Sequence, residues 1–109
     1  MIQSIKKSDE FKNVYKNGKS YANKYLVMYV MKSGREENRL GISVSKKVGN
    51  SVVRHRIARL LRESFRLNNE KFHSGWDIAV IARAAAKGKN YHDIESAFVH
   101  LVKLHKILI

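Results

Sequence analysis

The segment from Lys46 to Arg66 carries the side chains with the clearest capacity for binding chemistry. It holds seven cations against a single acid, Glu63, and five of those cations are arginines. A guanidinium group binds phosphate through a rigid fork of N–H donors, whereas an ammonium group acts as a point charge. The segment therefore predicts a phosphate-binding surface. Its cations are Lys46, Lys47, Arg54, Arg56, Arg59, Arg62 and Arg66.

The same segment has the periodicity of an amphipathic helix over residues 51–67. At about 100° per residue, its large apolar side chains share an arc of roughly 140°, and most of its cations share the opposite arc. The apolar arc holds Val53, Ile57, Leu60, Leu61 and Phe65; the basic arc holds His55, Arg56, Arg59, Arg62 and Arg66, with Arg54 at the border. Asn50 or Ser51 can cap the start. We expect the apolar face to pack on a sheet, which argues against a membrane-surface helix.

No other group of residues predicts a catalytic site in the protein itself. The nine acids are scattered, and Asp93 and Glu95, two residues apart on an expected helix, do not share a face. The five histidines show no metal-ligand spacing, and Ser43 and Ser45 lack the context of a nucleophile elbow. We predict no catalytic and no metal-ligating side chain. A histidine pair of the kind used by metal-free ribonucleases stays open.

Several further elements must position the basic helix. Ser8 is expected to cap a first helix over residues 9–17, whose first turn is acidic. Residues 19–32 are rich in β-branched and aromatic side chains and predict extended chain, broken near Asn23-Lys24. Residues 40–44 alternate with a period of two, and after a polar turn they predict the second strand of a hairpin.

The remaining elements complete an α/β pattern. Residues 75–82 predict a buried strand, which should lie parallel to residues 40–44 because a long helix intervenes. Asn90 is expected to cap a last helix that begins at Tyr91. The fold class is thus an α/β sandwich with about four strands in a central sheet and three helices. The general rule for such crossovers predicts the right-handed form.

Composition restricts the class of protein further. The chain has 109 residues, a net charge of +13 and no cysteine, so we expect one domain (residues 1–109) without disulfides or a thiolate zinc site. So large an excess of positive charge favours a polyanionic partner, RNA or DNA before an acidic membrane surface. The longest apolar run, residues 25–31, is too short to span a membrane, and the N-terminus lacks the apolar core of a signal peptide. A cytoplasmic location follows as an expectation.

The run of residues 41–65, from Gly-Ile-Ser-Val-Ser-Lys-Lys to Arg-Glu-Ser-Phe, resembles the protein subunit of bacterial ribonuclease P. Residues 11–18, Ala22-Asn23-Lys24 and Ile81-Ala82-Arg83 are similar to flanking pieces of that family, in the same order. One position departs from the pattern, because the usual arginine–asparagine–arginine core is Arg54-His55-Arg56 here. Histidine can still donate a hydrogen bond to a phosphate or a base edge.

The resemblance implies an RNA-based enzyme. The RNA subunit carries the catalytic center and uses Mg²⁺, held mainly by RNA and substrate, to cleave the 5′ leader from precursor tRNA. The protein docks its basic helix on that RNA through Lys46, Arg54, His55, Arg56, Arg59, Arg62 and Arg66. A cleft between this helix and the sheet receives the leader at Phe11, Tyr15, Tyr29, Ser43 and Lys47. The family also implies a left-handed crossover between the parallel strands.

Two other classes of function remain open on the residues alone. One is a general RNA-binding module that uses the basic helix without any cleavage partner. The other is a DNA-binding protein whose helix enters a major groove, although a strand rather than a short helix precedes the basic helix. We expect neither DNA nor a membrane as partner.

Overall fold

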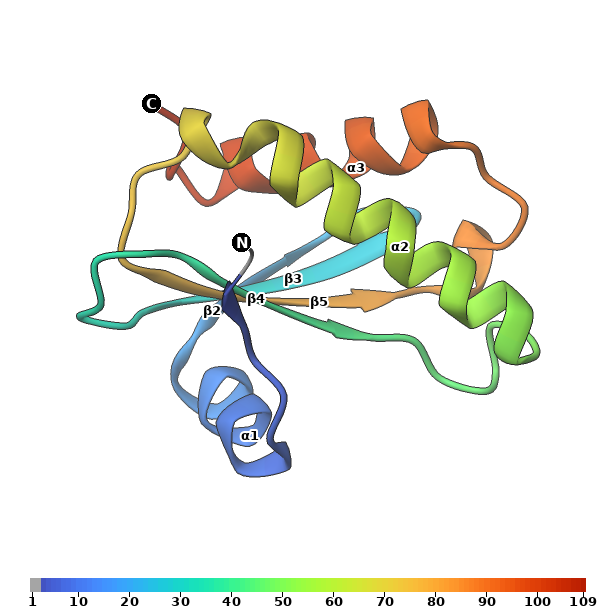
Figure 1. Cartoon of the computed structure of the whole chain (residues 1–109), viewed down its shortest axis with the longest axis horizontal. Coiled ribbons are helices and arrows are strands. Elements are labelled where there is room, and N and C mark those ends of the chain that lie inside the picture. Colours follow the sequence, from blue (N-terminus) through green and yellow to red (C-terminus); the bar gives the residue numbers. More distant parts are fainter. Residues whose placement is uncertain (1–2) are drawn as a thin grey trace.

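The computed structural model describes residues 3–109 and contains one mixed sheet with helices on both of its faces (Figure 1). The five strands lie in the order β1-β4-β5-β3-β2. The strands are β1 (Gln3–Ser4), β2 (Lys19–Ala22), β3 (Leu26–Lys32), β4 (Arg39–Ser43) and β5 (Trp76–Ala82). The helices are α1 (Ser8–Asn17), α2 (Ser51–Asn68) and α3 (Tyr91–Leu104), with 3-10 turns at η1 (Asn69–Lys71) and η2 (Ala84–Ala86). The predicted α/β class is confirmed, and the two-residue β1 adds a fifth strand.

The strand pairing corrects one prediction. The break near Asn23 separates β2 from β3, which pair antiparallel, but β3 and β4 do not form the expected hairpin. Instead β5 lies between them, antiparallel to β3 and parallel to β4, with Ile78 opposite both Val30 and Leu40. The physical reason is burial: Ile78, Ala79 and Val80 are all inaccessible to solvent, so β5 needs a covered position in the center of the sheet.

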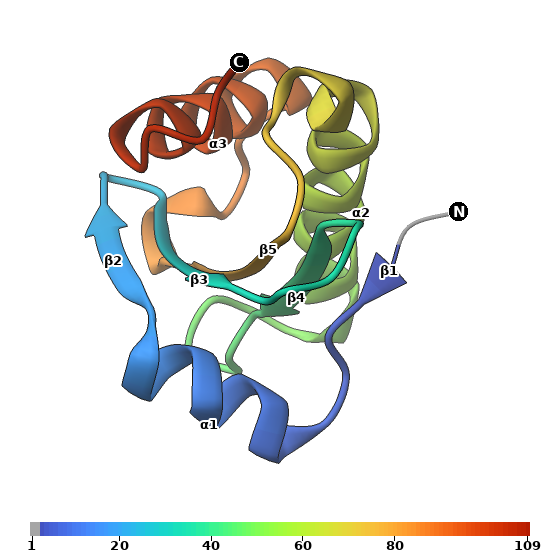
Figure 2. The same ribbon diagram turned by 90° about the vertical axis from the view of Figure 1, so that its left-hand side faces the viewer.

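The β4–α2–β5 connection has the uncommon hand. Figures 1 and 2 together show that, viewed along the direction of β4, the chain rises to α2 and returns to β5 in the anticlockwise sense. The crossover is therefore left-handed, as the resemblance implied. The general rule, which holds in about 98% of such units, is wrong here.

The two faces of the sheet are covered unequally. Helices α2 and α3 lie together on one face, and α1 lies alone on the other (Figure 2). The main core fills the first face and includes Leu26, Met28 and Val80 of the sheet with Leu61 and Phe98 of the helices. A smaller cluster fills the second face around Ile5, Val14 and Ala79. The sheet thus holds α1 and α2 on opposite sides, which separates any sites built on them.

The helix starts follow the expected capping chemistry with one exception. The Asn50 side chain accepts a hydrogen bond from the Val53 amide (3.0 Å), and the Asn90 side chain accepts one from the Asp93 amide (2.9 Å). At α1 the prediction of Ser8 as N-cap is wrong by one residue, because Lys7 occupies that position. The Lys7 amide donates to Glu10 Oε1 (3.3 Å), so the acid predicted to favour this helix start does contact it. No helix in residues 3–109 combines the length and apolarity that crossing a membrane requires.

Candidate nucleic-acid interface

Helix α2 presents the face that the sequence predicted. Its buried positions include Ile57, Leu61 and Phe65, which pack into the main core. The opposite face exposes the side chains of His55, Arg59, Arg62 and Arg66 to solvent. Because no acid lies in the first turn and Asn50 caps the helix, the positive end of the helix dipole adds to the charge of this face.

Three arginines of α2 differ in how many of their N–H donors form hydrogen bonds within the protein. Arg56 is half-buried, and its Nη1 donates to the Lys89 carbonyl (2.9 Å), which fixes the side chain against the loop before α3. Arg66 forms an exposed ion pair with Glu63, and the guanidinium lowers the pKa of the Glu63 carboxyl. Arg54 keeps a buried Nε that has no hydrogen-bond partner within residues 3–109. Arg66 is therefore the predicted contact whose charge is most reduced by an internal partner.

The loop that leads into α2 extends the basic surface. Lys46 and Lys47 lie in the loop between β4 and α2, and both are exposed. On the outer side of α2, a shallow hollow of about 480 Å³ is lined by Ser51, Val52, His55, Arg56 and Arg59. Val52 is 75% exposed there, so an apolar side chain lies among donors. Such a mixture suits the sugar and phosphate groups of a nucleic-acid backbone.

The predicted aromatic positions come together, but not beside α2. Phe11 and Tyr15 of α1 lie with Tyr29 of β3 in a half-buried row. The ring centroids of Phe11 and Tyr15 are 6.0 Å apart, and those of Tyr15 and Tyr29 are 4.9 Å apart. This row belongs to the smaller cluster, under α1. The expectation of a cleft between the basic helix and the sheet is therefore wrong. The strand alternation is the reason, since Tyr29 points to the face that α2 does not cover.

Strand β4 shapes the floor of this aromatic surface. Gly41 lies beneath Phe11, and a Cβ atom at that position would approach the ring's Cε1 to 2.7 Å. Burial raises the pKa of the Tyr15 hydroxyl above its ordinary value, while a hydrogen bond with Ser43 acts in the opposite direction. Ser43 therefore lies beside Tyr15 of the row, and Lys47 lies exposed in the loop that follows this strand.

A buried ion network ties α1 to the sheet and was not predicted. Arg39 donates from Nε and Nη2 to the two carboxylate oxygens of Asp77 (2.8 and 2.7 Å), and from Nη1 to Glu10 (2.7 Å). Asp77 is 2% exposed. The Arg39 guanidinium lowers the pKa of Glu10, and its own pKa is raised, mainly by Asp77. The three residues lie far apart in the chain, so only knowledge of the strand order could have found them.

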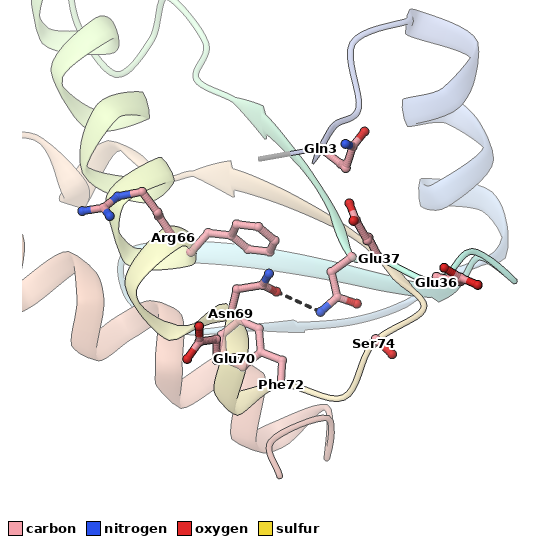
Figure 3. Close-up of a pocket in the computed structure, with 10 residues that line it drawn as sticks. Gln3, Glu36, Glu37, Arg66, Asn69, Glu70, Phe72 and Ser74 are labelled. Atoms are coloured by element: carbon pink, nitrogen blue, oxygen red, sulfur yellow. Dashed lines mark hydrogen bonds between the residues drawn. The ribbon is translucent and has the colours of Figure 1, made fainter. Parts of the chain in front are cut away.

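The far end of the sheet has the opposite chemistry. A pocket of about 450 Å³ opens there between the β3–β4 turn and the end of α2 (Figure 3). Three glutamates, Glu36, Glu37 and Glu70, line it. Asn38 also lines the pocket and donates to Asn69 Oδ1 (3.1 Å), the hydrogen bond drawn as a dashed line in Figure 3. This acidic lining repels phosphate and makes the pocket an unsuitable RNA site.

The side chains do not suit a protein-held magnesium ion. Residues 3–109 contain no group of three or more His, Asp or Glu side chains that converge as metal ligands. Several carboxylates already have partners: Glu10 and Asp77 bind Arg39, and Glu95 accepts from Tyr91 (2.6 Å) and Asn68 (3.0 Å). No step of a reaction is therefore assigned to a metal ion held by this chain.

Comparison with known proteins gives a consistent result. The family model for Ribonuclease P matches residues 2–106. The chain is 68% identical to the ribonuclease P protein component of Lachnoclostridium phytofermentans, over 99% of this chain and 93% of that protein. It is 50% identical to the component of Alkaliphilus oremlandii, over 94% and 90%.

The chain belongs to the ribonuclease P family.

Solved structures of ribonuclease P proteins agree with the fold. The Staphylococcus aureus protein superposes with a TM-score of 0.91 at 38% identity, and the alignment covers all of both chains. The Thermotoga maritima protein gives 0.86 at 30% identity, over 94% of this chain and 96% of that one. Ribonuclease P is the endoribonuclease of tRNA 5′ maturation, and this chain is its protein component, which acts together with an RNA subunit.

Proposed function

We propose that this protein binds the catalytic ribonuclease P RNA through the basic face of α2 and the 5′ leader of precursor tRNA through the aromatic surface under α1. The observation that carries the first half is the division of α2 into a buried apolar face and an exposed basic one. The apolar face is held in the core, so the cations can meet an RNA backbone without any rearrangement of the fold. The RNA-contact residues are Lys46, Arg54, His55, Arg56, Arg59, Arg62 and Arg66.

The second half of the proposal concerns the leader. A single strand of variable sequence is best held by aromatic rings and cations, because every base has a face that can stack. Phe11, Tyr15 and Tyr29 are only partly buried, so each ring keeps some exposed surface. Ser43 adds a hydroxyl beside Tyr15, and Lys47 adds an exposed charge in the loop that follows β4. Since this surface and α2 lie on opposite faces of the sheet, one protein can contact both RNAs at once.

Magnesium enters the proposal on the RNA side. The ion would be held mainly by the RNA subunit and the substrate, where it would supply the activation of water for cleavage of the leader. The protein supplies no catalytic side chain. Its positive charge reduces the repulsion between two polyanions, which lowers the magnesium concentration that the complex needs. Residues 1–109 act as a single RNA-binding domain, and the cytoplasm is the expected location.

The test is cleavage of precursor tRNA by a bacterial ribonuclease P RNA at low magnesium, with and without the protein. Strong stimulation is expected, with cleavage at the mature 5′ end and none by protein alone. Arg59→Ala with Arg62→Ala should weaken binding to the RNA subunit by roughly 10- to 100-fold and reduce the slope of log K against log salt by about 1.5. Arg35→Ala, an exposed arginine on the β3–β4 turn, is the matched control and should change neither.

Two outcomes would overturn the proposal. If the protein fails to stimulate a cognate RNA, the assignment of an assisting role fails. If leaderless and leader-bearing substrates respond equally to Tyr15→Ala, the aromatic surface does not hold the leader.

A further inference from the structure

The turn between β2 and β3 meets the end of β5 at one edge of the molecule. The Arg83 guanidinium donates to the Asn23 carbonyl (2.9 Å), across 60 residues of chain, and the Arg83 amide donates to the Tyr25 carbonyl (2.8 Å). Pairing of Leu26 with Ala82 sets this register. Two short pieces that resemble the family pattern, 22–24 and 81–83, are thus neighbours in space, and the functions described above use neither.

This turn is held in one conformation by a side chain. Asn23 Oδ1 accepts from the amides of Tyr25 (3.2 Å) and Leu26 (3.0 Å), while its Nδ2 donates to the Ala97 carbonyl of α3 (2.9 Å). Because Asn23 bonds both its own turn and α3, the turn is fixed in place before any ligand binds. Such preorganisation lowers the entropic cost of association.

The fixed turn gathers positive charge around an aromatic ring. Lys24 Nζ lies 6.0 Å and Lys89 Nζ 5.4 Å from the Tyr25 ring centroid, and the two lysines come from different elements. Arg83 and Lys87 are exposed nearby in the chain, on the segment between β5 and α3. We name Lys24, Tyr25, Arg83, Lys87 and Lys89 the sheet-end patch.

A hollow of about 290 Å³ adjoins Tyr25, with Lys24 and His92 in its wall. Asp93 is the one acid among the residues that line it, and its backbone amide is used by the Asn90 cap. Lys24 is the cation of the patch that lines this hollow, and the other three lie on the segment between β5 and α3. None of these cations forms an ion pair within residues 3–109.

The patch is continuous with the basic face of α2. Arg56 donates to the carbonyl of Lys89 (2.9 Å), so the outer face of the helix and the patch are joined by a direct hydrogen bond. Tyr25 also packs against the main core, on the α2–α3 side of the sheet, whereas Tyr15 and Tyr29 belong to the cluster under α1. A ligand bound at the patch can therefore also contact α2, whereas the leader surface lies on the other face of the sheet.

We infer that the sheet-end patch is a second contact for the RNA subunit, which binds another segment of the same RNA's phosphodiester backbone beside Tyr25. This rests on the proposed docking of that RNA on α2. The basic face of α2 and the patch adjoin at the hydrogen bond between Arg56 and Lys89. Binding of RNA at both would restrict the orientation of the protein on the RNA more than binding at α2 alone. The pre-tRNA is the alternative occupant that the experiment separates.

Binding of the RNA subunit alone is the first measurement. Lys24→Ala with Lys89→Ala should weaken its Kd by roughly 5- to 50-fold and reduce the salt slope by about 1.5, with the KM for precursor tRNA at saturating holoenzyme unchanged. Lys32→Ala with Lys103→Ala, two exposed lysines elsewhere, is the matched control. An unchanged Kd overturns the inference, and a raised KM with unchanged Kd assigns the patch to the substrate.

Parallel measurement of the Arg59 and Arg62 variants separates the two proposals. If those variants weaken Kd and the patch variants do not, only the second contact fails; if neither pair has an effect, the docking on α2 fails as well.

A second readout uses single-cysteine variants and measures position on the RNA instead of affinity. The chain has no cysteine, so Lys24→Cys and Arg59→Cys can each carry a single tethered iron chelate. In the complex, the two positions should cleave different segments of the RNA subunit by hydroxyl radicals. Cleavage from position 24 no stronger than from a Lys103→Cys control would overturn the second contact.

Discussion

The two ends of the sheet use their charged groups differently. At the end where β4 and β5 begin, Arg39 is bound to both Asp77 and Glu10, and Asn38 bonds the residues around it. At the end where those strands finish, the sheet-end patch, Lys46 and Lys47 form no ion pair within residues 3–109. The first end uses its charges to hold α1 on the sheet. The second end leaves its charges available for RNA. These charges repel one another and the other cations of a chain whose net charge is +13, which destabilises the folded state.

The largest expected effect tests the internally paired end. Arg39→Ala leaves Asp77 buried without its partner, and loss of one member of a buried pair typically costs about 3–5 kcal/mol of unfolding free energy. Urea denaturation of the variant measures this directly. Arg35→Ala, four residues earlier and exposed, should stay within about 0.5 kcal/mol of the parent. Equal, small effects of both variants would contradict the assigned role of the network.

A smaller loss is expected where α1 meets the floor of the aromatic surface. Gly41→Ala places a methyl group against the Phe11 ring, and overpacking of this kind costs about 1–3 kcal/mol. The displaced ring should also raise the KM for leader-bearing precursor tRNA, with little change in Kd for the RNA subunit. Gly34→Ala is the control for open space, although its positive φ adds backbone strain. A leader-independent rise in KM would contradict the separation of the two surfaces.

Substitution of the exposed arginines Arg59 and Arg62 should hardly change the stability of the fold. Arg59→Ala with Arg62→Ala removes two exposed charges from a strongly basic protein, so the free energy of unfolding should change by less than about 0.5 kcal/mol per residue. The affinity for the RNA subunit should nevertheless fall by roughly 10- to 100-fold. Thermal unfolding and RNA titration of one preparation measure both. A large fall in melting temperature would mean that these arginines serve packing instead.

The smallest expected effect is on how the melting temperature depends on pH, at the end of the sheet where Arg39 pairs with Glu10. Arg39 lowers the pKa of Glu10, so the ionised carboxyl stabilises the fold above the pKa it has in the unfolded chain. This contribution is lost as the pH falls through the lowered pKa. Glu10→Gln should therefore flatten the decline of melting temperature between about pH 5 and 3. Glu36→Gln, an acid of the turn with no ion pair in the described chain, should leave the profile unchanged.

His105, at the end of α3, should also contribute to how stability depends on pH. Burial lowers the pKa of His105, whose Nε2 lies 2.9 Å from the Met28 carbonyl. The neutral ring stabilises the fold above about pH 6.5, and this contribution decreases as the pH falls. His105→Gln should reduce the change in melting temperature between pH 7.5 and 5.5; a change as large as in the parent would show that other groups dominate that range.

Local patterns were enough to place most elements. The period of the apolar residues in α2, the caps at Asn50 and Asn90, and the break at Asn23 all depend on neighbours within a few residues, and the structure confirms them. The cap of α1 was misplaced because Ser8 has the better intrinsic preference, while the backbone places Lys7 there and uses Glu10 instead.

Relations between distant segments were beyond such patterns. The missing hairpin, the ion network and the position of the aromatic row all depend on the insertion of β5 between β3 and β4. Alternation along β3 says that Tyr29 and Met28 face opposite ways, but not which of them lies under α1.

The sequence by itself therefore determined the basic face of α2, most of the elements and the resemblance to the family, since each depends on contiguous residues. Only the tertiary structure decided the strand order and the opposite placement of the aromatic surface and the basic helix; it also showed the left-handed crossover, which the family resemblance implied but no local pattern did. The physical reason is that burial in one shared core selects among pairings that are equally compatible with the local pattern.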